Sequence, residues 1–167
     1  MDKLYAPWRD QYVMSQTKKD QVRACVFCTL FDGKEPDKDR YILYNDIDVV
    51  VLLNLYPYNA GHLLIVPKKH VAELYDLSDK ELLKMMKLSA MSTQFVKQAL
   101  TCEASNFGAN LGKIAGGGIP EHVHLHVVPR FLGDTGFFTV VGQAKQISVD
   151  LNSVYKKLQP YFENISL

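Results

Sequence analysis

The sequence has little that would direct the protein to nucleic acid, to a membrane or to a secretory route. Its 19 basic and 18 acidic residues are interspersed and leave a net charge of +1, so we expect no nucleic-acid and no membrane partner. The first ten residues, MDKLYAPWRD, lack the apolar stretch of a secretory signal. The longest apolar region, VVVLLNLYPYNAGHLLIVP, is interrupted by Asn54, Pro57 and His62. It cannot supply the ~20 continuous residues of a membrane-spanning helix.

Cysteine is also scarce, with three residues in the chain. Cys25 and Cys28 form a C-x-x-C pair, which in a reducing compartment more often binds a metal or does redox chemistry than forms a structural disulfide. Two alternatives to metal stay open: a pair of buried small side chains, or a redox pair, although no βαβ unit surrounds it. Cys102 is expected to be a small core residue. These features predict a cytoplasmic protein.

The composition is that of one globular domain. Hydrophobic residues make up 47% of the 167 positions, which is enough for a sizeable core. No repeat, low-complexity tract or linker divides the chain, so a single domain over residues 1–167 is predicted. The balanced charge favours a small molecule as the partner.

The order of the predicted elements indicates an α+β fold. Runs of β-branched, aromatic and other apolar residues predict strands at 40–46, 48–54, 62–69, 105–112 and 122–130. Ser78 and Glu81 form a capping box at the start of a long amphipathic helix, whose apolar positions recur every three or four residues. A short helix near 151–158 closes the chain. We expect an antiparallel sheet of about five strands with the long helix on its apolar face.

The stretch EHVHLHVVPR, residues 121–130, carries three of the five histidines at alternate positions. Because residues two apart on a strand share a face, His122, His124 and His126 are predicted to face outward, opposite the long helix. A single metal cannot bind all three, since on a strand the outer Cβ atoms would stand about 13 Å apart, whereas zinc ligands lie ~2 Å from the ion. The three histidines must therefore have different roles.

The C-x-x-C pair offers two thiolates and needs two further ligands to complete a closed tetrahedral zinc site. Histidine is a common partner in such sites. The spacing leaves four candidates, and the residues alone do not choose among them: His62, His70, His122 and His126.

A glycine-rich loop, GKIAGGGIPEH, precedes the histidines. The backbone amides of Gly116, Gly117 and Gly118 can approach a ligand closely and form an anion-binding concavity. The loop is not a P-loop, because Lys113 is followed by neither Ser nor Thr. Beside three histidines, it favours a phosphate chain as the ligand. A neutral imidazole can attack phosphorus near pH 7, and the phosphoramidate that forms hydrolyses readily.

On these features the chain resembles the histidine-triad, or HIT, superfamily of nucleotide hydrolases and transferases. HVHLHVV at 122–128 matches its signature of histidines alternating with apolar residues, and CVFC, NAGHLLIVPKKH and NLGKIAGGG stand in the expected order. The resemblance covers roughly residues 5–145. YAPWRDQYV, LNLYPYNAGHLLIVP, IPEHVHLHVVPR and GDTGFFTVV are most similar to the branch of diadenosine tetraphosphate phosphorylases and their bacterial HIT-like relatives.

The resemblance implies roles for the catalytic candidates. His124 is the implied nucleophile, and its other nitrogen is expected to donate to a backbone carbonyl near His122. His126 and His62 would contact the α-phosphate and stabilise the charge that develops on its oxygens.

The resemblance also implies binding sites. Asn54 occupies the ribose-binding position. Phosphate would lie against Asn110 and the glycines Gly116, Gly117 and Gly118. A structural zinc would be bound by Cys25, Cys28, His70 and His122, and no organic cofactor is implied.

The implied reaction is nucleotidyl transfer, with phosphorolysis of diadenosine tetraphosphate to ADP and ATP as the expected form. Many HIT hydrolases carry a Gln shortly before the triad, and the glycines here leave room for inorganic phosphate as the attacker. Two alternatives stay open: a hydrolase that releases AMP from dinucleoside polyphosphates or nucleoside phosphoramidates, and a nucleotide-binding module with slow catalysis. The resemblance further implies a homodimer whose two sheets join.

Overall fold

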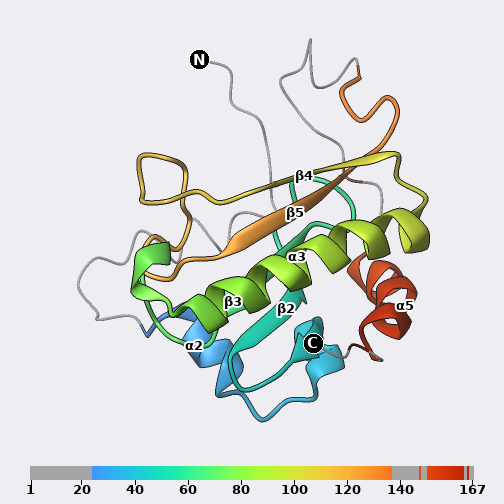
Figure 1. Cartoon of the computed structure of the whole chain (residues 1–167). Coiled ribbons are helices and arrows are strands. Elements are labelled where there is room, and N and C mark those ends of the chain that lie inside the picture. Colours follow the sequence, from blue (N-terminus) through green and yellow to red (C-terminus); the bar gives the residue numbers. More distant parts are fainter. Residues whose placement is uncertain (1–23, 137–146, 148–149, 164, 166–167) are drawn as a thin grey trace.

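The computed structural model describes residues 24–136, 147, 150–163 and 165. These residues form one five-stranded sheet in the order β1-β2-β3-β5-β4, with every neighbouring pair antiparallel (Figure 1). The strands are β1 (Ile42–Asn45), β2 (Val49–Leu53), β3 (Leu63–Pro67), β4 (Ala104–Gly108) and β5 (Leu125–Arg130). The expected α+β fold with about five antiparallel strands is confirmed. The segment YAPWRDQYV and most of GDTGFFTVV lie outside the described residues.

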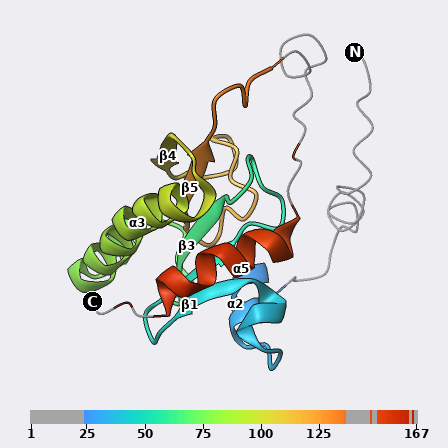
Figure 2. The same cartoon turned by 90° about the vertical axis from the view of Figure 1, so that its right-hand side faces the viewer.

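Two helices cover one face of the sheet. The long helix α3 (Asp79–Leu100) begins with the expected capping box, in which Ser78 and Glu81 bond each other's backbone N–H groups. The helix α5 (Leu151–Phe162) packs beside α3, and a turned view shows both helices with the short α2 (Val26–Phe31) (Figure 2). Two 3-10 turns, η2 (Asp37–Arg40) and η3 (Leu74–Asp76), complete the helical elements. No described helix is long and apolar enough to cross a membrane.

The central strands are buried on both faces. In β2, Val49 and Val51 belong to the core under α3 and α5, whereas Val50 lies on the opposite face with Phe27 of α2. β3 alternates in the same way. This double burial explains why both strands are continuous apolar runs rather than alternating ones.

The last strand differs from the expectation in two ways. It begins at Leu125 rather than His122, since its ladder with β3 stops at the pair Ile65–Leu125, although β3 itself continues to Pro67. The Val123 N–H instead bonds the Val71 carbonyl. The three histidines lie on the face opposite α3, but that face is not open to solvent: His122 is 0% and His124 8% exposed.

Candidate active site and metal centre

Four side chains from three separate segments meet near the start of β5, on the face of the sheet opposite α3. Cys25 is the N-cap residue of α2, Cys28 lies in α2, His70 follows β3, and His122 precedes β5. The Sγ atom of Cys25 lies 3.3 Å from His122 Nδ1, and that of Cys28 lies 3.4 Å from His70 Nδ1. One ligand atom from each residue lies within 4.8 Å of the others. The structure therefore brings together the four residues implied as metal ligands.

The orientation of His122 tests whether this group suits a metal. Its Nε2 atom donates to the Pro67 carbonyl over 2.8 Å, which leaves Nδ1 unprotonated and directed at the two thiols. Burial lowers the pKa of His122, and a metal-binding imidazole must be neutral. Burial and the neighbouring Cys25 raise the pKa of the Cys28 thiol, an effect that a bound cation would reverse. Two sulfur and two nitrogen donors with an oriented imidazole are the ligand set of a structural zinc site.

The middle histidine presents one free nitrogen. The Nδ1 atom of His124 donates to the His122 carbonyl over 2.9 Å, the bond that the resemblance implies. The proton is thereby held on Nδ1, so Nε2 carries the lone pair. Burial lowers the pKa of His124, and the ring is consequently neutral near pH 7. A neutral imidazole with one fixed tautomer is suited to attack an electrophile.

The third histidine is coupled to His62. The backbone N–H of Tyr58 donates to His62 Nδ1 over 3.1 Å, so the His62 proton lies on Nε2. That nitrogen donates to His126 Nδ1 over 2.9 Å, and the His126 proton therefore lies on Nε2. The Nε2 atom of His126 is buried and has no hydrogen-bond partner among the described residues. The pair thus holds one N–H donor ready for a ligand.

Burial dominates the electrostatics of this pair. It lowers the pKa of His62 to about 3 and that of His126 to about 4, with a smaller contribution in each case from the neighbouring histidines. Both rings are therefore neutral at physiological pH and act through N–H dipoles rather than full charges.

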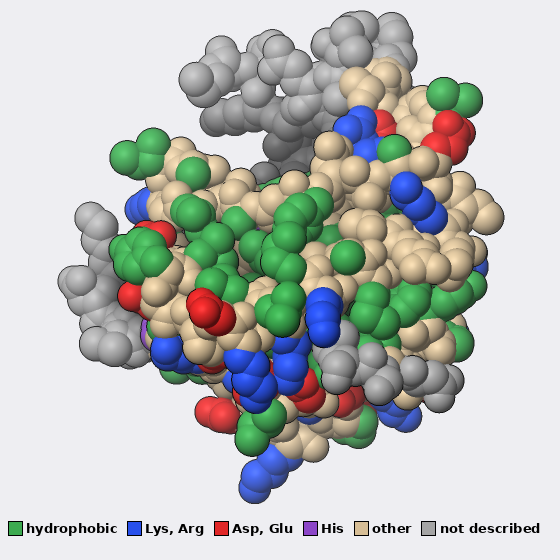
Figure 3. Space-filling model, viewed as in Figure 1, with side chains coloured by type: hydrophobic (Ala, Val, Ile, Leu, Met, Phe, Trp, Pro, Cys, Tyr) green, Lys and Arg blue, Asp and Glu red, His purple; other side chains and the backbone are tan. Residues whose placement is uncertain are grey.

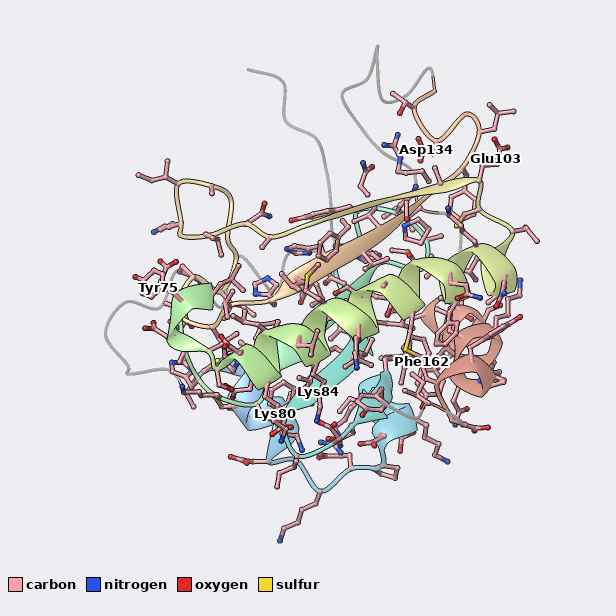
Figure 4. The ribbon with its side chains drawn as sticks, viewed as in Figure 1. Tyr75, Lys80, Lys84, Glu103, Asp134 and Phe162 are labelled. Carbon is pink, nitrogen blue, oxygen red and sulfur yellow. The ribbon has the colours of Figure 1, made fainter. Side chains whose placement is uncertain are left out.

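Two asparagines position the loop that carries His62. Asn54 donates from Nδ2 to His62 Nδ1 over 3.2 Å, so the expected ribose-binding residue lies beside the histidine pair. Asn59, for which no functional role was expected from the sequence, is 6% exposed and donates to the Pro129 carbonyl and to Asp134, each over 2.8 Å. Asp134 lies just beyond β5 (Figure 4). The loop is therefore tied to the end of the strand that carries His126.

The glycine-rich loop connects β4 to β5. A Cβ atom at Gly117 would lie 2.9 Å from the Gly112 carbonyl oxygen and 3.1 Å from that of Asn110, so no larger residue fits there without a shift. The N–H groups of Gly116 and Gly117 are bonded within the loop, to Lys113 and Gly112. Among the three glycines, Gly118 is the one whose N–H has no protein acceptor within the described residues.

Two aromatic residues of the site were missed in the sequence. The Phe27 ring, 3% exposed, packs edge-on against both His122 and His124, with centroid distances of 5.3 and 5.1 Å. The Tyr58 ring packs against His62 at 4.7 Å and His126 at 5.7 Å. In the sequence Phe27 lies between the two cysteines, and only this position could have indicated that it belongs to the site. Tyr58 lies in a stretch that reads as a turn, so no sequence pattern marked it.

Comparison with known proteins places this geometry in a family. The family model described as "HIT domain" matches residues 35–133, and the chain belongs to the HIT family. It is 35% identical over 150 residues to AP-4-A phosphorylase of Mycobacterium tuberculosis, covering 88% of this chain and 77% of the relative. It is also 35% identical over 135 residues to an uncharacterised HIT-like protein of Methanocaldococcus jannaschii, covering 81% and 98%.

A solved structure agrees with the fold and is pertinent to the metal group. The zinc-bound histidine triad family protein from Mycobacterium smegmatis is similar with a TM-score of 0.68 and 27% identity, over 83% of this chain and 93% of that one. The present chain brings together a Cys2His2 group that could hold a metal.

Proposed function

We propose that this protein is a nucleotidyl transferase that cleaves a dinucleoside polyphosphate through a covalent nucleotidyl-histidine, with diadenosine tetraphosphate as the substrate and inorganic phosphate as the acceptor. The observation that carries the proposal is the pairing of two complementary imidazoles. The Nε2 atom of His124 has a free lone pair, because Nδ1 is bonded to the His122 carbonyl. The Nε2 atom of His126 is a buried donor without a partner.

In the first step the His124 Nε2 atom attacks the α-phosphorus. A P–N bond forms, the P–O bond to the remaining polyphosphate breaks, and ATP leaves with the electron pair. The Nδ1 proton stays on the ring, where the His122 carbonyl stabilises the imidazolium character that develops. His126 donates from Nε2 to a phosphoryl oxygen, and His62 holds His126 in the tautomer that can do so. Such donors act most strongly where charge grows in the transition state.

Nucleotide binding is proposed to use the asparagines and the glycine loop. Asn54 lies 3.2 Å from His62, which supports a ribose contact next to the α-phosphate. Asn110 and Gly116 to Gly118 lie in the loop that connects β4 to β5, and the Gly118 N–H, which has no protein acceptor within the described residues, supports a backbone contact to phosphate.

A structural zinc held by Cys25, Cys28, His70 and His122 is part of the proposal. A closed four-ligand set leaves no position for a catalytic water. The metal would join α2 to the segment before β5, and the carbonyl of its ligand His122 accepts the bond that orients His124. Free thiols at Cys25 and Cys28 suit a reducing compartment, which supports the cytoplasm as the location.

A homodimer is proposed on the basis of the sheet edge. Among the described strands, β4 pairs only with β5, and its Phe107 is 45% exposed. The face that carries α3 and β4 shows hydrophobic side chains at its surface (Figure 3). An open edge with an apolar flank invites a second copy to continue the sheet. Sedimentation of a monomer at micromolar concentration would contradict the dimer.

The reaction is tested by separating the products of diadenosine tetraphosphate with and without inorganic phosphate. ADP and ATP in the presence of phosphate are expected, together with an AMP adduct on His124 that can be trapped by rapid denaturation at alkaline pH. AMP and ATP alone at every phosphate concentration would replace phosphorolysis with hydrolysis. If no adduct forms, the covalent route is wrong.

A further inference from the structure

Tyr58 links the two halves of the proposed site. Its ring lies nearly parallel to that of His126, with an interplanar angle of 23°, and its hydroxyl lies 3.5 Å from Asn110 Nδ2. The backbone carbonyl of Asn110 lies so close to Gly117 that a Cβ atom added there would stand 3.1 Å from it. One side chain therefore extends from the histidine pair to the segment that is proposed to hold phosphate.

The hydroxyl of Tyr58 is available to a ligand. The side chain is half-exposed, at 50%, unlike the buried histidines against which it packs. The amide of Asn110 is a donor, so at this contact the Tyr58 oxygen is the acceptor. The Tyr58 O–H proton has no acceptor among the described residues, and it can be donated to an anion at the mouth of the site.

We infer that Tyr58, together with Asn110, selects inorganic phosphate over water as the group that attacks the nucleotidyl-His124 adduct. The inference rests on the proposed function and names the residues that decide its second step. A phenol and a carboxamide supply hydrogen-bond donors to an incoming phosphate dianion. Hydrogen bonds to charged groups are stronger than those to neutral ones, so the pair favours phosphate over a neutral water.

Phosphate and water also differ in whether they must lose a proton as they attack the adduct, and this difference likewise favours phosphate. A phosphate oxygen attacks the phosphorus, a new P–O bond forms, and the P–N bond breaks with its electron pair returning to His124 Nε2. The attacking oxygen carries no proton, so the products are ADP and neutral His124 without any base. Water must lose a proton as it attacks, and since neither a phenol nor a carboxamide is suited to accept it, that proton must pass to the departing His124 Nε2 atom.

The inference is tested with Tyr58→Phe, which keeps the ring on His62 and His126 and removes only the hydroxyl. Diadenosine tetraphosphate is turned over at a fixed phosphate concentration, and the ratio of ADP to AMP is measured. We expect the ratio to fall about tenfold, the effect of losing one hydrogen bond to a charged group. Asn110→Ala should lower it in the same direction. The ratio does not depend on how much protein is folded or on the rate of the first step.

Tyr75→Phe is the matched control, because Tyr75 is 81% exposed and lies on η3, outside the site (Figure 4); its ratio should equal that of the wild type. An unchanged ratio in both Tyr58→Phe and Asn110→Ala overturns the inference. The His124 adduct is assayed first in the wild type. Failure to form it contradicts the proposed function, whereas an adduct with an unaltered ratio contradicts only the role of Tyr58.

Discussion

His122 and His126 stand four residues apart in one segment, yet their rings are used in opposite ways. His122 donates from Nε2 to the Pro67 carbonyl and turns Nδ1 toward the two thiols. His126 accepts at Nδ1 from His62 and leaves Nε2 as a free donor. The same residue type is thus oriented toward the two thiols in one position and leaves a free N–H donor in the other, as the proposed roles in metal binding and phosphate binding require. The group that occupies the second nitrogen decides which.

The largest effect is expected at His124, which lies between these two. His124→Ala removes the proposed nucleophile, and neither neighbouring histidine can replace it, because one is directed at the thiols and the other is bonded to His62. Turnover should fall by at least ~10³-fold, while nucleotide binding persists. Turnover and equilibrium binding are measured on the same preparation. Retention of more than a few per cent of wild-type turnover would exclude the covalent route.

A smaller loss is expected at His126. His126→Ala removes one donor to the phosphoryl oxygens and should lower turnover by ~10²-fold, the scale for a single charge-stabilising donor. Bound metal, measured by elemental analysis, should be unchanged, because His126 is not one of the four clustered ligands. If His126→Ala also loses its metal, the histidine pair and the metal group at His122 are not independent of each other.

Loss of the two cysteine ligands of the proposed metal site is expected to affect thermal stability more than turnover. Replacing Cys25 and Cys28 by Ser should abolish metal binding and lower the Tm by roughly 10 °C, the shift that ~3 kcal/mol produces in a chain of this size. Turnover per folded molecule should change less than in His126→Ala. Thermal unfolding and metal analysis provide the measurements. Wild-type protein purified without chelator that contains no metal would refute the zinc proposal.

The smallest effect is a dependence of stability on pH. Burial lowers the pKa of His126 to about 4, whereas a histidine in the unfolded chain has a pKa of ~6.5. As pH falls below ~6.5 the unfolded chain binds a proton that the folded chain does not, so the free energy of unfolding decreases until the folded pKa is reached. Urea midpoints at pH 7 and pH 5 should differ less in His126→Gln than in the wild type. Equal differences would show that His126 does not contribute.

Local patterns predicted most of the fold and part of the site. The capping box at Ser78 and the three-to-four-residue apolar period marked α3, because helix ends and amphipathic faces depend on residues close in sequence. The strands were placed within a few residues for the same reason. The start of β5 was misplaced, since it depends on where the pairing with β3 stops, at Ile65, 60 positions before Leu125 in the printed sequence.

The candidate site residues could be identified from the sequence, but which of them contact one another could not be predicted from it. Spacing left four histidines as partners for Cys25 and Cys28, and the folded chain brings two of them to the thiols. The tautomer of His62 depends on the backbone N–H of Tyr58, and His124 is packed against Phe27 of α2, from another part of the chain. Hydrogen bonds and desolvation act over a few ångströms, so they are set by which distant segments the fold brings into contact.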